Sequence, residues 1–474
     1  MKKIAIYLFL ILLLGSCTKE LTSINNDPKS PTSVPSTSLF TNAQHTLVNT
    51  ISNSNVNSNI FRLVDQYWQE TTYTDESNYD IVTRPIPQTL FTTLYRDVLR
   101  DFETAKSLYA TDISNATTQK NDIAVTDIME VYSWYYLVTT FGNIPYKEAL
   151  DINNTFPKYD DQKTIYYDLL TRLDADIANL NATGSSLGSA DIVYGGDVTK
   201  WKKFANSFKL KMGMTIADFD AAKAKTTVES AVQSGVFTSS ADNASFQYLS
   251  GPPNTNQVWV DLVQSGRKDF VAASTVVNTM QGLNDPRLSQ YFTTDAAGGY
   301  SGAAPGASAS YSTFSKPSAT LTAPDYPALL LSYDEVEFFL AEAIERGFNV
   351  GGTASTHYNN AVTSSILYWG GTSMQAATYL AQPSIAYATA AGTYKQKIGL
   401  QKWIALYNRG WEEWIEVRRF DYPILIAPAT AKSAFPVRLT YPINEQNTNT
   451  TNYNTAASAI GGDKVTTKLF WDIF

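Results

Sequence analysis

The sequence predicts an all-α protein: a single large domain of paired helices, with loop insertions and a few short β-ribbons. From residue 39 onward, apolar residues recur at intervals of three and four, which is the spacing of one helix face. Several helical stretches follow one another as they do in paired-helix repeats, and strand signals are few. Although 474 residues would suffice for two or three domains, no abrupt shift in composition marks a boundary between them.

Two helices have the clearest apolar stripes. The first stripe consists of Tyr166, Leu169, Leu173, Ile177 and Leu180. The second consists of Trp201, Phe204, Ala205, Phe208, Met212 and Ile216, with four lysines mostly off the stripe. Such spacing buries one face of each helix against the core. Further helical stretches are expected near residues 40–52, 88–110, 123–141, 354–369 and 395–419.

A helix is expected to begin after Ser332, because Ser332 and Glu335 have the spacing of a capping box. Gly347 is well placed to end this helix. The small and aromatic residues that follow approximate a tetratricopeptide pair, in which small residues allow close approach and an aromatic ring fills the groove: Leu340, Ala341, Ala343, Ala354, Tyr358 and Ala361. Residues 131–150 and 162–180 are a second candidate pair. The alternative is an irregular helical domain with alanine at ordinary contacts.

Four segments depart from the helical pattern. Residues 245–249 and 437–441 have the composition of short strands. Residues 295–327 are rich in Gly, Ser, Ala and Pro, and residues 446–462 are rich in Asn, Thr, Ala and Gly. Long irregular segments of this kind are usually functional loops or links.

Composition excludes several classes of function. The chain has 36 Lys and Arg against 44 Asp and Glu, a net charge of −8, so it lacks the basic excess that nucleic-acid binding requires. A single Cys excludes a disulfide framework and any cysteine-rich metal site, and two His leave little for metal ligation. We therefore expect no metal centre, no cofactor and no nucleic-acid partner.

The N-terminus is expected to be an export signal. Residues 1–16 contain two lysines, an apolar run and small residues directly before Cys17, the only cysteine. The run of 11 apolar residues is too short for a membrane span. The string before Cys17 resembles a bacterial lipobox, so we expect cleavage there and lipidation of Cys17. Residues 17–38 then form a lipidated tether and residues 39–474 the helical domain. The alternative is an ordinary secreted protein with an incidental thiol.

Several longer strings resemble the SusD/RagB family of nutrient-binding lipoproteins. The most specific runs from Gln401 to Leu406 and on through Trp411-Glu412-x-Trp414-x-Glu416-x-Arg418-Arg419 to Pro423. The other matching strings occur in the family's order: Phe141–Leu150, Lys200–Ser207, Asp285–Leu288 and Gly461–Asp472, the last resembling the SusD-like branch. The resemblance spans nearly the whole chain.

This resemblance implies tetratricopeptide-like helix pairs on an outer-membrane lipoprotein that faces outward. It implies a SusC-like TonB-dependent transporter as partner, with this protein as the transporter's substrate-capturing lid. The implied ligand is an oligosaccharide, a polysaccharide or another nutrient, and the implied role is binding without catalysis. The acidic export signal expected after Cys17 is thin, since only Lys19-Glu20 and Asp27 follow.

Aromatic residues on loops are the candidate ligand contacts. Sugars stack their C–H faces on flat rings and hydrogen-bond to neutral polar groups. Two clusters meet this description, one within residues 66–80 and one in or near Gly/Pro-rich loops, and together they supply Trp68, Tyr73, Tyr79, Trp259, Tyr300 and Tyr311. Against this, most of the 60 aromatic residues must pack between helices. Neutral glycans fit the low charge density, whereas polyanions would need a local basic pocket. Peptides remain an alternative.

Two rival functions compete with nutrient binding. Glu412 and Glu416 lie four apart on an expected helix, and a glycosidase needs two carboxyl groups across a cleft. The neighbouring Arg418 and Arg419 favour a buried face edged by ion pairs instead. His45 and His357 stand alone, without the neighbours of a catalytic or metal site. The second rival is a tetratricopeptide scaffold for envelope proteins, which would present a peptide-binding groove.

Overall fold

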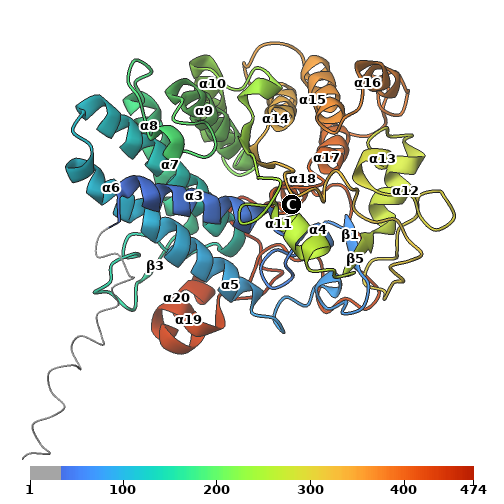
Figure 1. The fold of residues 1–474 in the computed structure, drawn as a ribbon, viewed down its shortest axis with the longest axis horizontal. Coiled ribbons are helices and arrows are strands. Elements are labelled where there is room, and N and C mark those ends of the chain that lie inside the picture. The colour runs from blue at the N-terminus through green and yellow to red at the C-terminus, as the bar shows by residue number, and fades with distance from the viewer. Residues whose placement is uncertain (1–33) are drawn as a thin grey trace, which may run out of the picture.

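The computed structural model describes residues 34–474, which form one mostly helical domain (Figure 1). The predicted fold class is therefore confirmed. Cys17 and most of the predicted tether lie outside the described residues, but the first described helix begins at Ser36, three residues before the predicted start of the domain. No helix within residues 34–474 has the length and hydrophobicity needed to cross a bilayer.

Short strands and turns of 3-10 or π helix interrupt the series of α-helices along the chain. The α-helices are α3 Ser36–Ser52, α4 Phe61–Val64, α5 Ile86–Thr92, α6 Arg100–Asp112, α7 Ala116–Phe141, α8 Gln162–Asn179, α9 Val198–Thr215, α10 Ala221–Ser234, α11 Gln257–Trp259, α12 Ser274–Gly282, α13 Leu288–Tyr291, α14 Tyr333–Glu345, α15 Ala354–Tyr368, α16 Ser373–Leu380, α17 Tyr394–Ala405, α18 Gly410–Phe420, α19 Ile443–Thr448 and α20 Thr450–Ala459.

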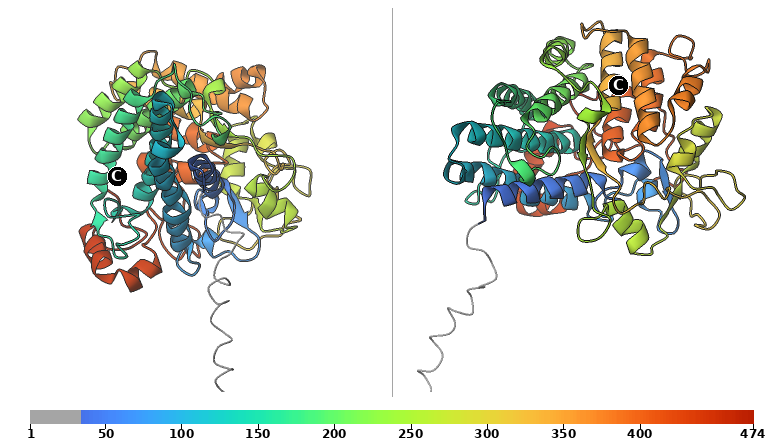
Figure 2. Two further views of the ribbon diagram at one scale, coloured as in Figure 1. Left: turned by 60° about the vertical axis from the view of Figure 1, so that its left-hand side comes forward. Right: turned by 45° about the horizontal axis from the view of Figure 1, so that its top comes forward.

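Paired helices make up the framework of the domain. α7 packs on α8, α9 on α10, and α14 on α15, and each pair also contacts the next through α8–α9 and α9–α14 (Figures 1 and 2). In the α14–α15 pair, Ala341 and Ala361 are fully buried in the same cluster as Tyr358, whereas Ala343 is buried in the main core cluster. Tyr358 fills the adjoining groove and donates a hydrogen bond to the carbonyl of Ile385 at 2.9 Å. The predicted pair at 340–361 is confirmed, and the pair predicted at 131–150 and 162–180 is confirmed in part, because α7 ends at Phe141.

Side-chain caps explain where several of these helices begin. Asn115, Asp161, Asp197 and Asp220 each accept hydrogen bonds from backbone N–H groups in the first turn of α7, α8, α9 and α10. The predicted capping box at Ser332 is wrong, because Ser332 precedes α14 without a capping bond. The carboxylate of Glu335 is instead paired with Arg409 and Lys211, which draw it into the core.

Three small antiparallel ribbons complete the fold. They are β1 (Trp68–Glu70) with β5 (Phe270–Ala272), β2 (Ile144–Pro145) with β3 (Tyr159–Asp160), and β4 (Ala244–Phe246) with β6 (Ala328–Leu331). The expected strand at 245–249 is confirmed in part by β4. Residues 437–441 form no strand, and 446–462 is largely helical, as α19 and α20, so these two expectations are wrong. Residues 295–327 are irregular, as expected.

The centre of the domain contains a network of buried charges rather than ion pairs at the edge of a face. On α18, Glu416 and Arg419 are buried and paired with each other at 2.8 Å. Arg419 also pairs with Glu342 of α14 at 2.6 Å, and Lys402 of α17 pairs with Glu416 at 2.9 Å. Buried charges are tolerated only when each has a partner, so these pairs fix how α14, α17 and α18 dock.

Candidate ligand-binding site

Three segments that lie far apart in the sequence meet at one end of the β1–β5 ribbon. The strands pair from Trp68 opposite Ala272 to Glu70 opposite Phe270. Beyond the ribbon, the N–H of Thr71 donates to the carbonyl of Asp269 at 2.8 Å, and the N–H of Ala309 donates to the carbonyl of Thr71 at 2.9 Å. The segment after β1, the segment before β5 and the irregular segment 295–327 therefore form one edge of the domain (Figure 1).

A surface hollow of about 240 Å³ lies at this edge, and we call it the β1–β5 hollow. Phe270 at its base is buried, whereas Tyr73 at its rim is 72% exposed. Polar and charged groups surround these rings. The residues that line the hollow are Val56, Glu70, Thr71, Thr72, Tyr73, Arg84, Arg267, Lys268, Asp269 and Phe270.

Two of the predicted ligand contacts lie beside this hollow. Tyr73 lines it directly. Tyr311, from segment 295–327, lies next to it, because the ammonium of the lining residue Lys268 is 5.9 Å from the centre of the Tyr311 ring. Lys316 approaches the same ring at 5.3 Å. The structure thus brings together one member of each aromatic cluster that the sequence singled out.

The other four predicted contacts do not line the hollow. Trp68 and Tyr79 are each only 2% exposed. The indole N–H of Trp68 donates to the hydroxyl of Tyr407 at 2.8 Å, and the hydroxyl of Tyr79 accepts from Gln66 at 3.1 Å, so both rings serve the core. Trp259 in α11 is half-buried, and Tyr300 is half-buried against the core cluster that includes Trp68.

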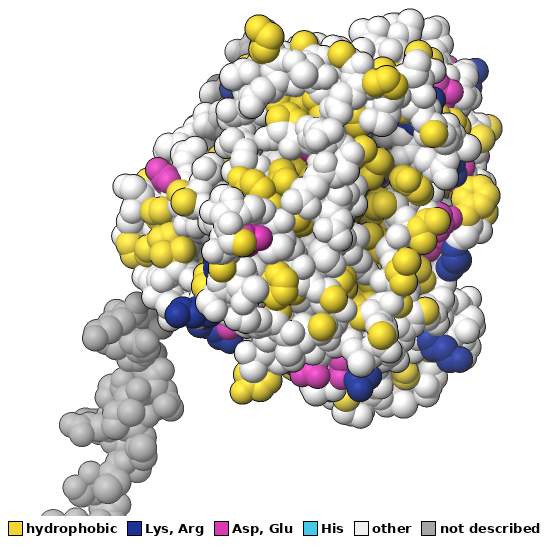
Figure 3. All heavy atoms as spheres, turned by 90° about the vertical axis from the view of Figure 1, so that its right-hand side faces the viewer, with side chains coloured by type: hydrophobic (Ala, Val, Ile, Leu, Met, Phe, Trp, Pro, Cys, Tyr) yellow, Lys and Arg dark blue, Asp and Glu magenta, His cyan; other side chains and the backbone are white. Residues whose placement is uncertain are grey.

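The face that carries segment 295–327, α12 and α13 is poor in charged groups. Figure 3 shows it mainly as hydrophobic and uncharged surface, with charged side chains gathered toward its lower and right-hand edges. Sequence reasoning missed Arg84, Arg267 and Lys268, because Arg84 lies far along the chain from the adjacent Arg267 and Lys268 and no motif links them. Only the pairing of β1 with β5 places them around one hollow.

An acidic pair lies beneath the hollow. Glu70 is buried next to Glu76, which is paired with Arg84. Burial, followed by the hydrogen bond with Glu76, raises the pKa of Glu70 to about 9. At neutral pH Glu70 therefore keeps its proton and donates to Glu76, while one of its oxygens accepts from the N–H of Ser77 at 2.9 Å. Glu70 therefore adds no negative charge to the floor of the hollow at neutral pH.

Replacing Glu70 by glutamine is expected to remove a loss of stability that develops as the pH rises from about 4.5 to about 9. Because the pKa of Glu70 is about 9 in the folded protein and 4.5 in an unfolded chain, only the unfolded chain releases the proton between these values. The free energy of unfolding should then fall by up to about 1.4 kcal/mol per pH unit across that interval. A glutamine side chain has the shape and donor of the protonated acid, so urea unfolding of the Glu70→Gln variant should lack the slope.

Measurements at pH 4 are the internal control for Glu70→Gln. At that pH the Glu70 carboxyl of the unmutated protein is mostly protonated in both the folded and the unfolded state. The two proteins should differ little at pH 4 and most at pH 8. An equal difference at both pH values would contradict the protonated state of Glu70.

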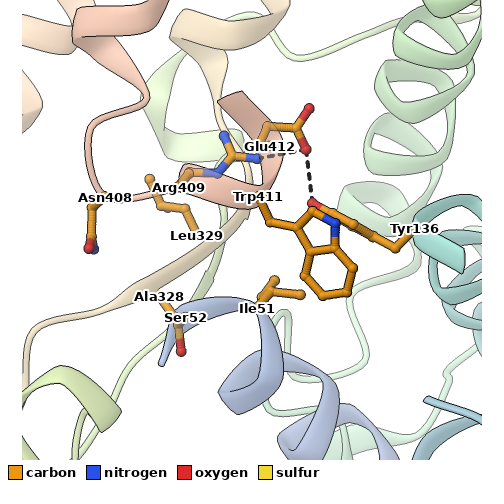
Figure 4. A pocket seen from close by; sticks show the side chains of 9 residues that line it. All are labelled: Ile51, Ser52, Tyr136, Ala328, Leu329, Asn408, Arg409, Trp411 and Glu412. Atoms are coloured by element: carbon orange, nitrogen blue, oxygen red, sulfur yellow. Dashed lines mark hydrogen bonds and ion pairs between the residues drawn. The ribbon is translucent and has the colours of Figure 1, made fainter. Parts of the chain in front are cut away.

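The glycosidase alternative depends on Glu412 and Glu416, and the structure places both in the core. Figure 4 shows the small cavity beside Glu412, where the hydroxyl of Tyr136 donates to its carboxylate at 2.8 Å and Arg409 points toward it at 3.9 Å. This cavity has a volume of about 20 Å³, room for little more than one water. A sugar cannot reach either carboxylate in this arrangement.

A second surface hollow, of about 450 Å³, lies among α6, α7 and α8. Its cations are Lys106, Arg172 and Lys147, and the first two are each bound by both Asp127 and Glu130 at 2.6–2.8 Å. Of its two aromatic residues, Trp134 is only 3% exposed and Tyr146 is half-buried, so neither presents a ring as open as that of Tyr73. The β1–β5 hollow is therefore the better candidate for a ligand that stacks on aromatic rings.

Comparisons with known proteins agree with this fold. A family described as "Starch-binding associating with outer membrane" matches residues 28–442, whereas no curated protein matches. The chain is similar to a solved structure titled "chitin-binding protein", with 27% identity, a TM-score of 0.81 and coverage of 93% of this chain and 100% of that one. A SusD homologue from Bacteroides uniformis has 27% identity, a TM-score of 0.77 and coverage of 92% and 99%.

A chitin-binding SusD homologue from Flavobacterium johnsoniae is similar in fold, with 24% identity, a TM-score of 0.78 and coverage of 92% of this chain and 97% of that one. The family match and the fold are thus consistent over the same length of chain. The resemblance found in the sequence is confirmed, and the chain belongs to the SusD-like family.

Proposed function

We propose that this protein binds a glycan at the β1–β5 hollow and does not cleave it. The observation that carries the proposal is the exposed ring of Tyr73 at the rim of a polar hollow, with Tyr311 beside it. An exposed aromatic ring stacks on the C–H face of a sugar, while Thr71 and Thr72 supply neutral hydrogen-bonding groups for its hydroxyls. Glycan binding in the family and in a similar solved structure supports the proposal.

Truncating the exposed ring of Tyr73 and the half-buried ring of Tyr311 tests the site. Tyr73→Ala and Tyr311→Ala should each weaken glycan binding by about fivefold, because an aromatic contact contributes about 1 kcal/mol. The measurement is isothermal titration against the glycan that the native protein binds from a panel. Phe156→Ala is the control, since Phe156 is also exposed (57%) but does not line the hollow. Equal affinities of all three variants and the native protein would place the ligand elsewhere.

The proposal extends to where the protein works. The family's description of outer-membrane association supports a position at that membrane. We infer that Cys17 carries the lipid anchor, that the domain faces the exterior, and that a SusC-like TonB-dependent transporter receives the glycan beneath this lid. Purification from detergent-solubilised outer membranes should recover a large β-barrel transporter with the native protein. A Cys17→Ser variant should appear unacylated by mass spectrometry, and recovery without a transporter would count against the lid.

A further inference from the structure

We propose that the glycan held at the β1–β5 hollow is anionic, with carboxylate or sulfate groups, rather than neutral. This inference rests on the proposed function and specifies its ligand. It departs from the expectation of a neutral glycan that the composition favours. The observation behind it is an excess of positive charge at one site of an otherwise acidic protein, whose net charge is −8.

Four cations lie in the β1–β5 hollow or beside the Tyr311 ring. Within residues 34–474, two of the four have an acidic partner. Arg84 is paired with Glu76, and Arg267 with Asp269 at 2.6 Å. Lys268 and Lys316 form no ion pair with any of residues 34–474. Asp75 is an exposed acid on the same segment as Tyr73, but it does not line the hollow. Lys268 and Lys316 are therefore available to a ligand.

The two lysines are held at the ring that would stack on the sugar. Their ammonium groups lie 5.9 and 5.3 Å from the centre of the Tyr311 ring. Lys316 also donates to the carbonyl of Phe314 at 2.9 Å, which keeps its head near that ring. A sugar on Tyr311 would place its acidic substituent within reach of an ammonium, and hydrogen bonds between charged groups are the stronger ones. A neutral sugar would form no charge–charge interaction with either ammonium group.

The net negative charge of the whole chain does not prevent such binding. At physiological ionic strength, exposed charges more than about 8–10 Å apart are largely screened, so the groups next to the ligand decide its charge preference. The hollow among α6, α7 and α8 shows the contrast, because Lys106 and Arg172 there are already bound by Asp127 and Glu130. Lys147, the third cation of that hollow, has no ion pair within residues 34–474, but it lies over no aromatic ring there. Lys268 and Lys316, in and beside the β1–β5 hollow, both lack an acidic partner in that range and lie over the half-buried Tyr311 ring.

The test compares the full mature protein, in detergent, against polygalacturonate, dextran sulfate, starch and chitin oligosaccharides by affinity electrophoresis and titration. We expect binding of the carboxylated polymer, the sulfated polymer or both, and weaker binding at 200 mM than at 50 mM NaCl. Lys268→Gln should weaken that binding by about tenfold, whereas Lys268→Arg should retain most of it. Lys120→Gln is the control, since Lys120 is exposed on α7 and does not line the hollow.

The outcomes separate this inference from the proposed function. Binding of starch or chitin alone, indifferent to salt and to Lys268→Gln, would overturn the inference and leave the glycan-binding function standing. Binding of an anionic polymer that Lys268→Gln and Lys120→Gln weaken equally would also overturn it, because the attraction would then not come from the hollow. Binding of none of the four glycans, and of no others in a wider panel, would overturn the proposed function as well.

Discussion

Replacing Arg419 by methionine is expected to lower the free energy of unfolding by about 3–5 kcal/mol. The guanidinium donates to Glu342 at 2.8 and 2.6 Å, to Glu416 at 2.8 Å and to the carbonyl of Met214 at 3.2 Å. All three charged side chains are buried. Methionine fills similar space but leaves two carboxylates facing each other without their shared cation, although Lys402 still reaches Glu416 and Arg346 still reaches Glu342.

Chemical denaturation monitored by the fluorescence of the buried tryptophans measures this loss. The matched control is Arg96→Met, because Arg96 is 71% exposed and its partner within residues 34–474 is the neighbouring Asp97 alone. Surface substitutions of this kind change stability by about 0.5 kcal/mol or less. A similarly small effect of Arg419→Met would show that α14 and α18 dock without this network, and the account of the core given above would be wrong.

Replacing Gly302 by alanine is expected to cost about 1–3 kcal/mol of stability and to weaken ligand binding at the same time. Gly302 lies where segment 295–327 crosses the end of β5, and the flanking Ala303 is hydrogen-bonded to Ala272 at 2.9 Å and to Ser274 at 2.7 Å. A Cβ at Gly302 would lie 2.5 Å from the nitrogen of Ser274 and would also meet the backbone of Ala273. Backbone cannot rotate away as a side chain can, so the segment itself must move.

That movement would be felt at the β1–β5 hollow, because the same segment carries Tyr311 and is bonded through Ala309 to Thr71. Gly299→Ala is the control within the segment, since its Cβ would meet nothing closer than the Asp295 carboxylate at 3.9 Å. Thermal unfolding and glycan titration of both variants give the two measurements. Unchanged stability and affinity of Gly302→Ala would mean that the segment is not held against β5 as described.

Helices were predicted well from the sequence where a periodic apolar face is enough to identify them. The stripe from Tyr166 to Leu180 corresponds to α8, and the stripe from Trp201 to Ile216 corresponds to α9, because a periodic apolar face needs only a core to pack against. It failed at residues 446–462, whose Asn and Thr residues are poor helix formers. There the side chain of Asn449 bonds to the distant carbonyl of Pro157 at 2.9 Å, a contact that no local window contains.

The candidate site was predictable only in part for the same reason. The polar, aromatic composition around Tyr73 and Tyr311 identified the right segments. It did not show that Trp68 is buried, because its partner Tyr407 lies more than 300 residues away in the chain. Nor did it show that Lys268 lines the same hollow as Tyr73 and lies next to the Tyr311 ring. This arrangement depends on β1 and β5, which are three residues long and pair across about 200 residues. Short strands with remote partners leave almost no periodic signal.

The place where the chain enters the domain has a mechanical consequence. α3 begins at Ser36 on one side of the molecule, and β1 and β5 lie toward the other (Figure 1). Between Cys17 and Val34 the backbone can span at most about 60 Å. If the lipid anchors the protein at its N-terminus, the β1–β5 hollow is on the side of the domain remote from that anchor. A small tilt of the domain about this anchor would then move the β1–β5 hollow farther than it moves the start of α3.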